Sequence, residues 1–432
     1  MFERPQVGER AILVHIDFGE GEADARIQEL SELAMSAGAE TVERVLATRH
    51  APNAKFFIGS GKVEDILILI RHHDADLVIF NHILSPSQER NLEKHFECRV
   101  LGRSGLILDI FAQRAQSFEG KLQVELAQLH YLSTRLIRGW THLERQKGGI
   151  GLRGPGETQL ETDRRLIGDR IKQLKGKLAK VRNQRSQGRQ ARKKAEIPAI
   201  SLVGYTNAGK STLFNTLSQS DVYVQDQLFA TLDPSLRKIQ LPKYPTVILA
   251  DTVGFIRDLP HDLIEAFRST LQETVEADLL LHVIDCAHPE KDSMIAEVKQ
   301  VLEAIGADNI PVLEVYNKID QLEHASVRSD QDEQGVVQRV WVSASAGLGI
   351  DALLQAIEDR LPNEIVSTTL RIPFDQGHIR AALFREQCVT QETTNSAEMQ
   401  WHFEVTITTA ALHALLKKYP NLESDYVASP PW

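Results

Sequence analysis

Cysteine is scarce in this chain of 432 residues, which contains only Cys98, Cys286 and Cys388 and no CxxC pair. Three widely separated cysteines predict neither a disulfide framework nor a cysteine zinc site, and this usage is typical of a reducing compartment. Long apolar runs are also lacking, so no segment should span a bilayer. Neither end carries a signal peptide or a prenylation box. We therefore expect a cytoplasmic protein without a membrane span.

Basic residues are outnumbered, since the formal net charge is −10, but they are unevenly distributed. Residues 164–194 contain thirteen lysines and arginines and one acid, Asp169, so this block carries a charge of +12. Such an uneven field indicates an acidic partner that meets one basic element.

The eight residues from Gly204 to Ser211 match the phosphate-binding pattern G-x-x-x-x-G-K-[ST] at every fixed position. An apolar strand pattern precedes them and a helix pattern follows, so backbone N–H groups and a helix N-terminus would converge on phosphate. Lys210 would place its charge between the outer phosphates, and the Ser211 hydroxyl would bind Mg²⁺. The predicted phosphate-binding residues are Gly204, Tyr205, Thr206, Asn207, Ala208, Gly209, Lys210 and Ser211.

Two later segments predict which base is bound. The segment NKID, Asn317 to Asp320, follows an apolar strand pattern. Asp320 can accept two hydrogen bonds from the N1–H and N2–H edge of guanine, which adenine does not offer. A backbone N–H at Ala344 could donate to guanine O6. We therefore predict GTP rather than ATP, with contacts from Asn317, Lys318, Asp320, Ser343, Ala344 and Ser345.

The metal and the γ-phosphate are addressed by two further segments, Asp251-Thr252-Val253-Gly254 and Phe229-Ala230-Thr231-Leu232-Asp233. Asp251 would reach Mg²⁺ through water, and the Gly254 N–H would meet the γ-phosphate. Thr231 would complete the Mg²⁺ shell only when the γ-phosphate is present, although a solvated loop threonine is the alternative. The predicted metal ligands are Ser211 and Thr231, and the predicted catalytic residues are Lys210, Thr231 and Gly254.

Phe255 stands where many GTPases place a glutamine that orients the attacking water. A phenyl ring cannot orient water, so we expect slow hydrolysis by the protein alone and stimulation by a partner. A packed switch residue is the simpler interpretation, and both can hold. Arg257 is predicted to be an exposed cation rather than a catalytic arginine.

Hydrophobic periodicity predicts an α/β fold in four parts. Residues 1–120 alternate strand and helix patterns, which predicts a small parallel α/β domain. Residues 121–196 carry two apolar stripes at heptad spacing around a glycine-rich stretch, which predicts an antiparallel helical hairpin with a basic second helix. Residues 197–362 should form a P-loop GTPase domain. Residues 363–432 should form a small α+β domain.

A basic hairpin with a glycine-rich tip suits insertion into structured RNA, because phosphate contacts supply affinity and glycine allows close backbone approach. The alternative is a solvated, self-supporting hairpin. The candidate RNA-binding residues are Arg138, Arg145, Lys147, Arg153, Lys172, Lys175, Arg182 and Arg185.

An incomplete second phosphate loop lies at Gly59-Ser60-Gly61-Lys62, where Phe56 replaces the first glycine and Val63 the final Ser/Thr. A glycine turn into a helix fits better. A nucleotide site here would make the chain an ATP/GTP-dependent RNA remodeller. The other alternative is a protein-partner signalling GTPase without an RNA role, which the basic block and the missing lipid site disfavour.

The chain resembles the HflX family of ribosome-associated GTPases over nearly its whole length. The most specific match is GGIGLRGPGETQLETDRR at residues 148–165, ahead of the basic helix. The segments GYTNAGKSTLFN, FATLDP, DTVGFI, NKID and FIGSGKVEDI are also similar to the family. Phe255 agrees with the hydrophobic residue that the family has after DxxG.

This resemblance implies a Ras-like GTPase domain that binds GTP, GDP and Mg²⁺. It implies association with the large ribosomal subunit and its rRNA, with the hairpin reaching toward the peptidyl-transferase region. It also implies splitting of stalled or idle ribosomes, especially under stress, with GTP hydrolysis stimulated by the ribosome. We expect a monomer.

Overall fold

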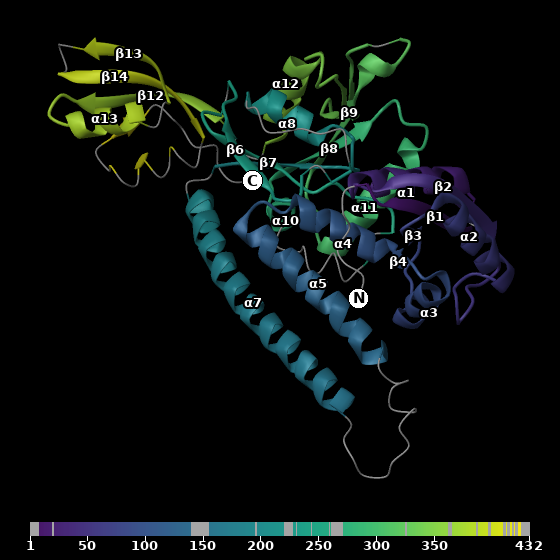
Figure 1. Cartoon of the computed structure of the whole chain (residues 1–432). Coiled ribbons are helices and arrows are strands. Elements are labelled where there is room, and N and C mark those ends of the chain that lie inside the picture. Colours follow the sequence, from purple (N-terminus) through teal and green to yellow (C-terminus); the bar gives the residue numbers. More distant parts are fainter. Residues whose placement is uncertain are drawn as a thin grey trace. The chain divides into compact units, whose positions relative to one another are not determined.

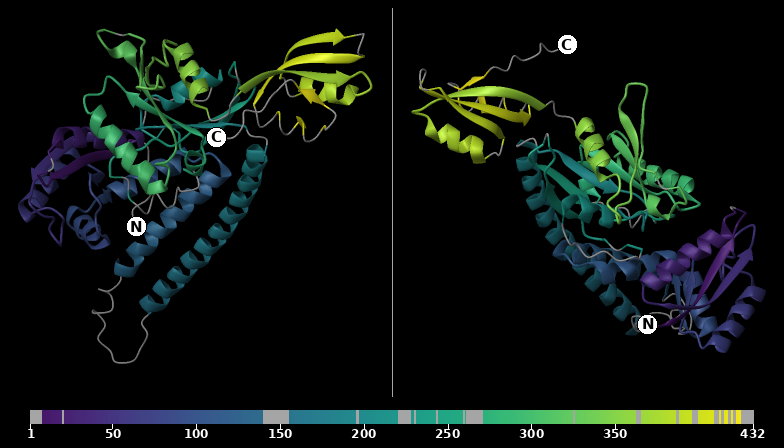
Figure 2. Two further views of the ribbon diagram at one scale, coloured as in Figure 1. Left: turned by 180° about the vertical axis from the view of Figure 1, so that it is seen from behind. Right: turned by 90° about the horizontal axis from the view of Figure 1, so that it is seen from above.

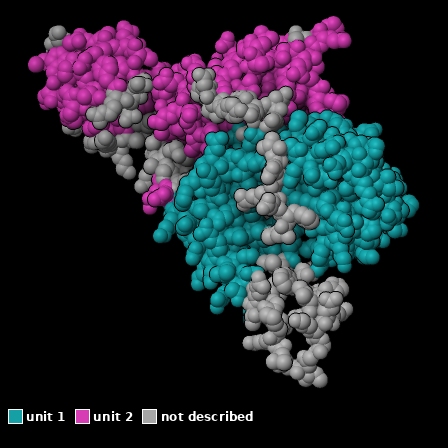
Figure 3. Space-filling view, viewed as in Figure 1, with its two compact units in different colours: residues 1–183, 225–233, 256–270 teal, residues 184–224, 234–255, 271–432 magenta. Residues whose placement is uncertain are grey.

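A computed structural model describes residues 8–19, 21–139, 155–194, 197–219, 228–229, 231–242, 244–258, 260, 271–324, 326–361, 365–385, 388–395, 399–408, 412, 415–416, 419 and 422–424. The chain forms two compact units, coloured separately in Figure 3. The first unit comprises Met1–Asn183, Gln225–Asp233 and Ile256–Thr270. The second comprises Gln184–Val224, Pro234–Phe255 and Leu271–Trp432.

The first unit begins with a parallel four-stranded sheet in the order β2-β1-β3-β4. Its strands are β1 (Arg10–Asp17), β2 (Glu40–Thr48), β3 (Leu77–Phe80) and β4 (Arg99–Gly102). The helices are α1 (Ala23–Ser36), α2 (Ser60–His73), α3 (Pro86–Phe96) and α4 (Arg103–Arg114). The predicted alternation of strand and helix is therefore confirmed. A capping box starts α3, where Ser85 and Gln88 exchange side-chain-to-backbone hydrogen bonds.

A helical pair follows, formed by α5 (Phe118–Gly139) and α7 (Pro155–Lys194). Residues 155–183 of α7 belong to the same unit as α5. Leu122 of α5 is buried against Leu174 and Leu178 of α7, and Arg170 pairs with Glu125 at 2.7 Å. Figures 1 and 2 show the two helices side by side. The 22 residues of α5 span about 33 Å at 1.5 Å per residue. The predicted glycine-rich tip, residues 140–154, lies outside the described residues.

The second unit contains a seven-stranded sheet in the order β10-β11-β9-β8-β5-β7-β6. Neighbouring strands pair in parallel from β11 to β7, while β6 and β10 are antiparallel to their neighbours at the two edges. The strands are β5 (Ala199–Val203), β6 (Ser235–Ile239), β7 (Val247–Asp251), β8 (Leu279–Asp285), β9 (Val312–Asn317), β10 (Ser329–Gln331) and β11 (Val337–Trp341).

The helices of this sheet are α8 (Lys210–Ser218), α10 (Gln272–Val275), α11 (Lys291–Ile305), a 3-10 turn at Ile319–Gln321 and α12 (Ile350–Arg360). Phe214 of α8 and Ile357 of α12 share one buried cluster with Leu202 of β5 and Leu281 of β8. The polar stretch between β9 and β11 contributes the exposed strand β10, which pairs with β11.

A second, antiparallel sheet lies near the C-terminus in the order β13-β14-β12-β15. Its strands are β12 (Ile365–Pro373), β13 (Val389–Asn395), β14 (Gln400–Thr408) and β15 (Glu423–Ser424), and α13 spans Gly377–Arg385. Leu383 of α13 is buried with Leu370, Ile372 and Phe403 of the sheet. The predicted α+β character of this region is confirmed.

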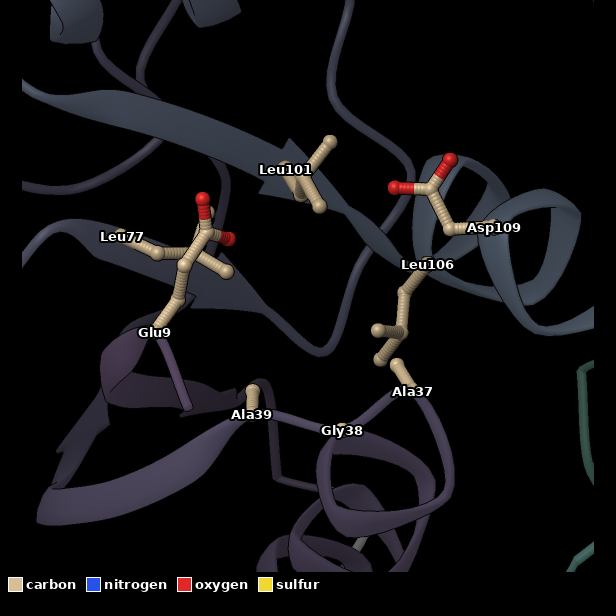
Figure 4. A pocket seen from close by; sticks show the side chains of 8 residues that line it. All are labelled: Glu9, Ala37, Gly38, Ala39, Leu77, Leu101, Leu106 and Asp109. Carbon is tan, nitrogen blue, oxygen red and sulfur yellow. The ribbon is translucent and has the colours of Figure 1, made fainter. Parts of the chain in front are cut away.

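The cysteines and one small cavity complete the description. Cys98, Cys286 and Cys388 are all buried and form no disulfide. A cavity of about 10 Å³, room for one water molecule, lies in the first unit between the segment before β1 and α4. Figure 4 shows its lining side chains, among which the carboxylates of Glu9 and Asp109 both pair with Arg99. This cavity is too small for a nucleotide.

Candidate guanine-nucleotide site

The phosphate loop connects β5 to α8, as its sequence predicts. Gly204 has φ 149°, and a Cβ at this position would collide with the carbonyl oxygen of Val283 on β8. Only glycine therefore lets the loop leave the sheet so close to its neighbouring strand. The α8 helix begins at Lys210, so its first backbone N–H groups face the end of the loop.

The Lys210 side chain is buried beneath the phosphate loop. Its ammonium donates to the carbonyl oxygens of Gly204 at 3.1 Å and Tyr205 at 2.7 Å. Burial lowers the pKa of Lys210 to about 8, and the Lys318 charge contributes, against an opposing effect of Asp251. The amine is thus held inside the loop, and a negatively charged phosphate would stabilise its protonated form.

Ser211 and Asp251 bring two oxygen donors together beside the loop. The Ser211 hydroxyl donates to the Asp251 carboxylate at 2.7 Å, and Asp251 is fully buried at the end of β7. The next residue, Thr252, is fixed by a 2.6 Å hydrogen bond to the carbonyl of Leu202. A hydroxyl and a carboxylate are the hard oxygen ligands that suit Mg²⁺.

The DxxG segment lies directly on the phosphate loop. Phe255 forms a parallel bridge with Tyr205, in which Thr206 N–H donates to Phe255 O at 2.8 Å and Phe255 N–H donates to Gly204 O at 3.1 Å. The Phe255 side chain is 1% exposed, and both Val253 and Gly254 are also buried. Phe255 is therefore a packed residue, as the simpler interpretation held.

The predicted base-recognition segments are also brought together. Asn317, at the end of β9, donates to Ala208 O at 3.0 Å and accepts from Ala344 N–H at 2.9 Å. Asp320 accepts from the Ser343 hydroxyl at 2.5 Å, and Ser345 is 3.1 Å from the same hydroxyl. The Ala344 N–H, predicted to meet guanine O6, is thus bonded to Asn317 here.

Lys318 completes this edge of the site. It has φ 65° and its ammonium pairs with Asp285 of β8 at 2.8 Å. The four nucleotide motifs of the second unit therefore converge at the carboxyl ends of its parallel strands, the usual ligand edge of such sheets.

The predicted switch segment belongs to the first unit. Phe229 and Leu232 are buried, Thr231 is half-buried, and Asp233 bonds to the start of α5. Ala230 lies outside the described residues. The roles of Thr231 toward Mg²⁺ and of the neighbouring residues toward GTP stay predictions.

One prediction in this region is wrong. Arg257 is 3% exposed rather than an exposed cation. Its guanidinium pairs with Glu22 at 3.1 Å, and its carbonyl accepts from the buried Arg103 at 2.7 Å. The anionic partner compensates the burial of its charge.

The basic helix α7 presents its charges to solvent. Lys172 and Lys175, two of the predicted RNA-binding residues, are exposed and have no ion-pair partner in the part of the chain that the structure describes. Four further cations on α7 are also exposed and have no ion-pair partner among the described residues. They are Arg164, Arg165, Lys177 and Lys180, none of which is among the predicted RNA-binding residues. Arg145, Lys147, Arg153 and the side chains of Arg138, Arg182 and Arg185 lie outside the described residues.

The incomplete second loop is a glycine turn into a helix, as expected. Gly59 precedes α2, and Lys62 pairs with Asp65 on the same helix at 3.1 Å.

Family models match most of the chain. They are described as GTP-binding GTPase N-terminal over residues 24–112, GTP-binding GTPase Middle Region over 114–192 and 50S ribosome-binding GTPase over 199–318. GTPase HflX from Escherichia coli (strain K12) is 55% identical over 392 residues, which cover 91% of this chain and 92% of that relative. This chain belongs to the HflX family. As an HflX GTPase, it binds and hydrolyses GTP.

A second relative agrees with this assignment to HflX. GTPase HflX from Caldanaerobacter subterraneus subsp. tengcongensis is 48% identical over 368 residues, 85% of this chain and 84% of the relative. Among solved structures, the crystal structure of the SsGBP and GDP complex is 24% identical, with a TM-score of 0.46, and covers 82% of this chain and 98% of that one. At that score the structural likeness adds nothing to the site. No helix in the described part of this HflX chain is long and apolar enough to cross a membrane.

Proposed function

We propose that this HflX GTPase is a GTP-driven switch that binds the large ribosomal subunit and splits stalled or idle ribosomes, under stress in particular. The observation that carries the proposal is the set of exposed cations on α7. Six described lysines and arginines of this helix face solvent without an ion-pair partner among the described residues. An unneutralised basic helix is the element that an rRNA surface would bind, through phosphate contacts.

The nucleotide site supplies the switch in this proposal. Lys210 would neutralise the outer phosphates, and the Gly254 N–H would contact the γ-phosphate once the Phe255 bridge leaves the loop. Ser211 would bind Mg²⁺ directly, Asp251 would hold a water of its shell, and Thr231 would complete the shell in the GTP state. When bound, the metal would stabilise charge on the phosphate oxygens during transfer.

Ribosome-stimulated hydrolysis follows from Phe255. Its buried ring cannot orient an attacking water, so another group must do so. We propose that docking on the ribosome supplies or orders that group. The family of 50S ribosome-binding GTPases, which matches residues 199–318, supports the same partner. We also propose a cytoplasmic, monomeric protein.

Sedimentation with ribosomal particles tests the proposal. Wild-type protein should pellet with the large subunit when a non-hydrolysable GTP analogue is present and much less with GDP. Lys172→Glu/Lys175→Glu should weaken this association by about tenfold or more at physiological salt, because two phosphate contacts become repulsive. Splitting is then followed by light scattering of intact ribosomes.

The control has the same change of charge elsewhere in the first unit. Arg71→Glu/Lys94→Glu alters two exposed cations on α2 and α3 and should leave association within about twofold, since these helices are outside the basic block. Equal binding with GTP analogue and GDP, or equal losses in both double variants, would contradict the proposal. A protein-partner switch would keep its partner in both.

A further inference from the structure

Asp233, the last residue of the switch segment, contacts the start of the hairpin. Both backbone N–H groups before α5, those of Gln116 and Ser117, donate to one oxygen of the Asp233 carboxylate, at 2.9 Å and 2.7 Å. The Ser117 hydroxyl donates to the other oxygen at 2.5 Å. Asp233 thus satisfies donors at the N-terminus of α5, where a negative charge is stabilised by the helix dipole.

Gly120 leaves room for this contact. It lies in the first turn of α5, and a Cβ at this position would collide with the Asp233 carboxylate. Glycine costs about 1 kcal/mol relative to alanine inside a helix, so it is a poor choice for the helix alone. The space that Asp233 occupies explains the glycine here.

A second anchor holds the same segment on the other side of Thr231. Leu228 N–H donates to the Ser36 hydroxyl at 3.1 Å, and the Phe229 ring packs edge-on against Phe111 of α4 at 4.8 Å between centroids. Thr231 is therefore two residues from Phe229 on one side and two from Asp233 on the other. One residue spans at most about 3.5 Å, so Thr231 cannot move far while both anchors hold.

We propose that Asp233 is a latch between the nucleotide switch and the hairpin, closed without γ-phosphate and opened when Thr231 moves toward the metal. This inference rests on the proposed function in taking Thr231 as the switch threonine. The structure shows the closed latch. In the same structure, the Thr206 N–H of the phosphate loop donates to the Phe255 carbonyl. Opening would free the Gln116 and Ser117 amides and release the Ser117 hydroxyl, which itself caps α5 by accepting from Gly120 N–H at 2.8 Å. The start of the hairpin therefore reads the nucleotide state. Coupling is reciprocal, so a weakened latch raises affinity for the GTP analogue.

Hydrogen exchange in the free, full-length protein tests the latch. In wild type, the amides of Gln116 and Ser117, which donate to Asp233, should exchange about fivefold faster with a GTP analogue than with GDP, because a lost capping hydrogen bond costs about 1 kcal/mol. Asp233→Ala should give the fast rate in both nucleotides. Gly120→Ala should do the same, because the methyl group displaces the carboxylate, and should bind the analogue more tightly.

The double variant Asp233→Ala/Gly120→Ala shows whether Gly120→Ala acts through Asp233, because its effect on amide exchange should then reverse. When Asp233 is already alanine, Gly120→Ala should slow exchange of the turn by about fivefold, since only helix propensity remains. Gly176→Ala on α7, where a Cβ meets no atom within 4 Å, is the matched control and should slow local exchange in either nucleotide. GDP affinity of Gly120→Ala within about twofold of wild type shows that the pocket is folded.

Two results would overturn the latch. One is identical exchange of the α5 turn with GDP and the analogue in wild type. The other is Gly120→Ala slowing exchange in the wild-type background as much as it does beside Asp233→Ala. No ribosome enters these measurements, so a latch that works while sedimentation shows no ribosome binding would overturn the proposed function alone.

Discussion

Lys210 gives the nucleotide site a pH dependence. Its pKa is lowered to about 8 in the free protein, and a bound phosphate would raise it again because opposite charge favours the ammonium. The complex then keeps a proton that the free protein loses, so nucleotide affinity should fall as the pH rises through about 8, by up to about tenfold per pH unit. Titration of fluorescent GDP from about pH 7 to about pH 9 measures this slope.

The Lys210→Arg variant is the control for that slope. Arginine stays protonated throughout this range, so its weaker binding should be nearly independent of pH. A flat profile in wild type would show that Lys210 keeps its proton in the free protein.

Asp320 offers a specificity test. An asparagine in its place would present a donor to guanine N2–H, so Asp320→Asn should weaken GTP binding by at least about a hundredfold. Xanthine carries an oxygen at that position, and the variant should gain affinity for xanthosine triphosphate. Competition between the two nucleotides measures the reversal, with the exposed Asp330→Asn on β10 as control. Unchanged GTP preference would remove Asp320 from base recognition.

Individual motif residues could be predicted because each motif is short and local. Lys210, Ser211, Asp251 and Asn317 lie where their patterns place them, at strand ends and at a helix start. Arg257 could not be predicted in the same way. Its carbonyl is bonded by Arg103, 154 residues away in sequence, and no local pattern carries that contact.

At the scale of elements, the pairing of α5 with α7 depends on a small apolar seam. Leu174 is fully buried in it, so Leu174→Ala should lower the local opening free energy of the pair by about 2 kcal/mol or more. Amide exchange along both helices measures the effect. Leu166→Ala on the same helix, 58% exposed, should change it by less than about 0.5 kcal/mol. Equal effects of Leu174→Ala and Leu166→Ala on the opening free energy would mean that the apolar seam does not stabilise the helix pair.

The heptad stripes predicted this pairing, since Leu122, Leu174 and Leu178 all came from them. The helix α4 carried no such signal. It starts at Arg103 directly after β4, its N-cap is Gly102 without a side-chain cap, and Ser104-Gly105 has the composition of a turn. Burial on several sides, rather than an amphipathic stripe or a cap, makes this segment helical.

For the whole molecule, the sequence predicted a succession of four parts, and those boundaries stay predictions. The compact units of the structure interleave instead, since Gln225–Asp233 and Ile256–Thr270 join the N-terminal part. The first contains the switch segment, and the second follows the DxxG segment closely. Contacts such as those of Asp233 with Ser117 arise from side chains more than a hundred residues apart, which periodicity cannot reveal.

The buried cysteines have a practical consequence for following this molecule in motion. Burial raises the pKa of Cys98 to about 12 and that of Cys286 to about 11, and Cys388 is likewise inaccessible. Thiolate, not thiol, reacts with maleimides, so the native protein should label slowly near neutral pH. A cysteine introduced on the solvent side of α7 would therefore carry a dye almost alone. Single-molecule fluorescence could then follow the motion of the hairpin without replacing the three native cysteines first.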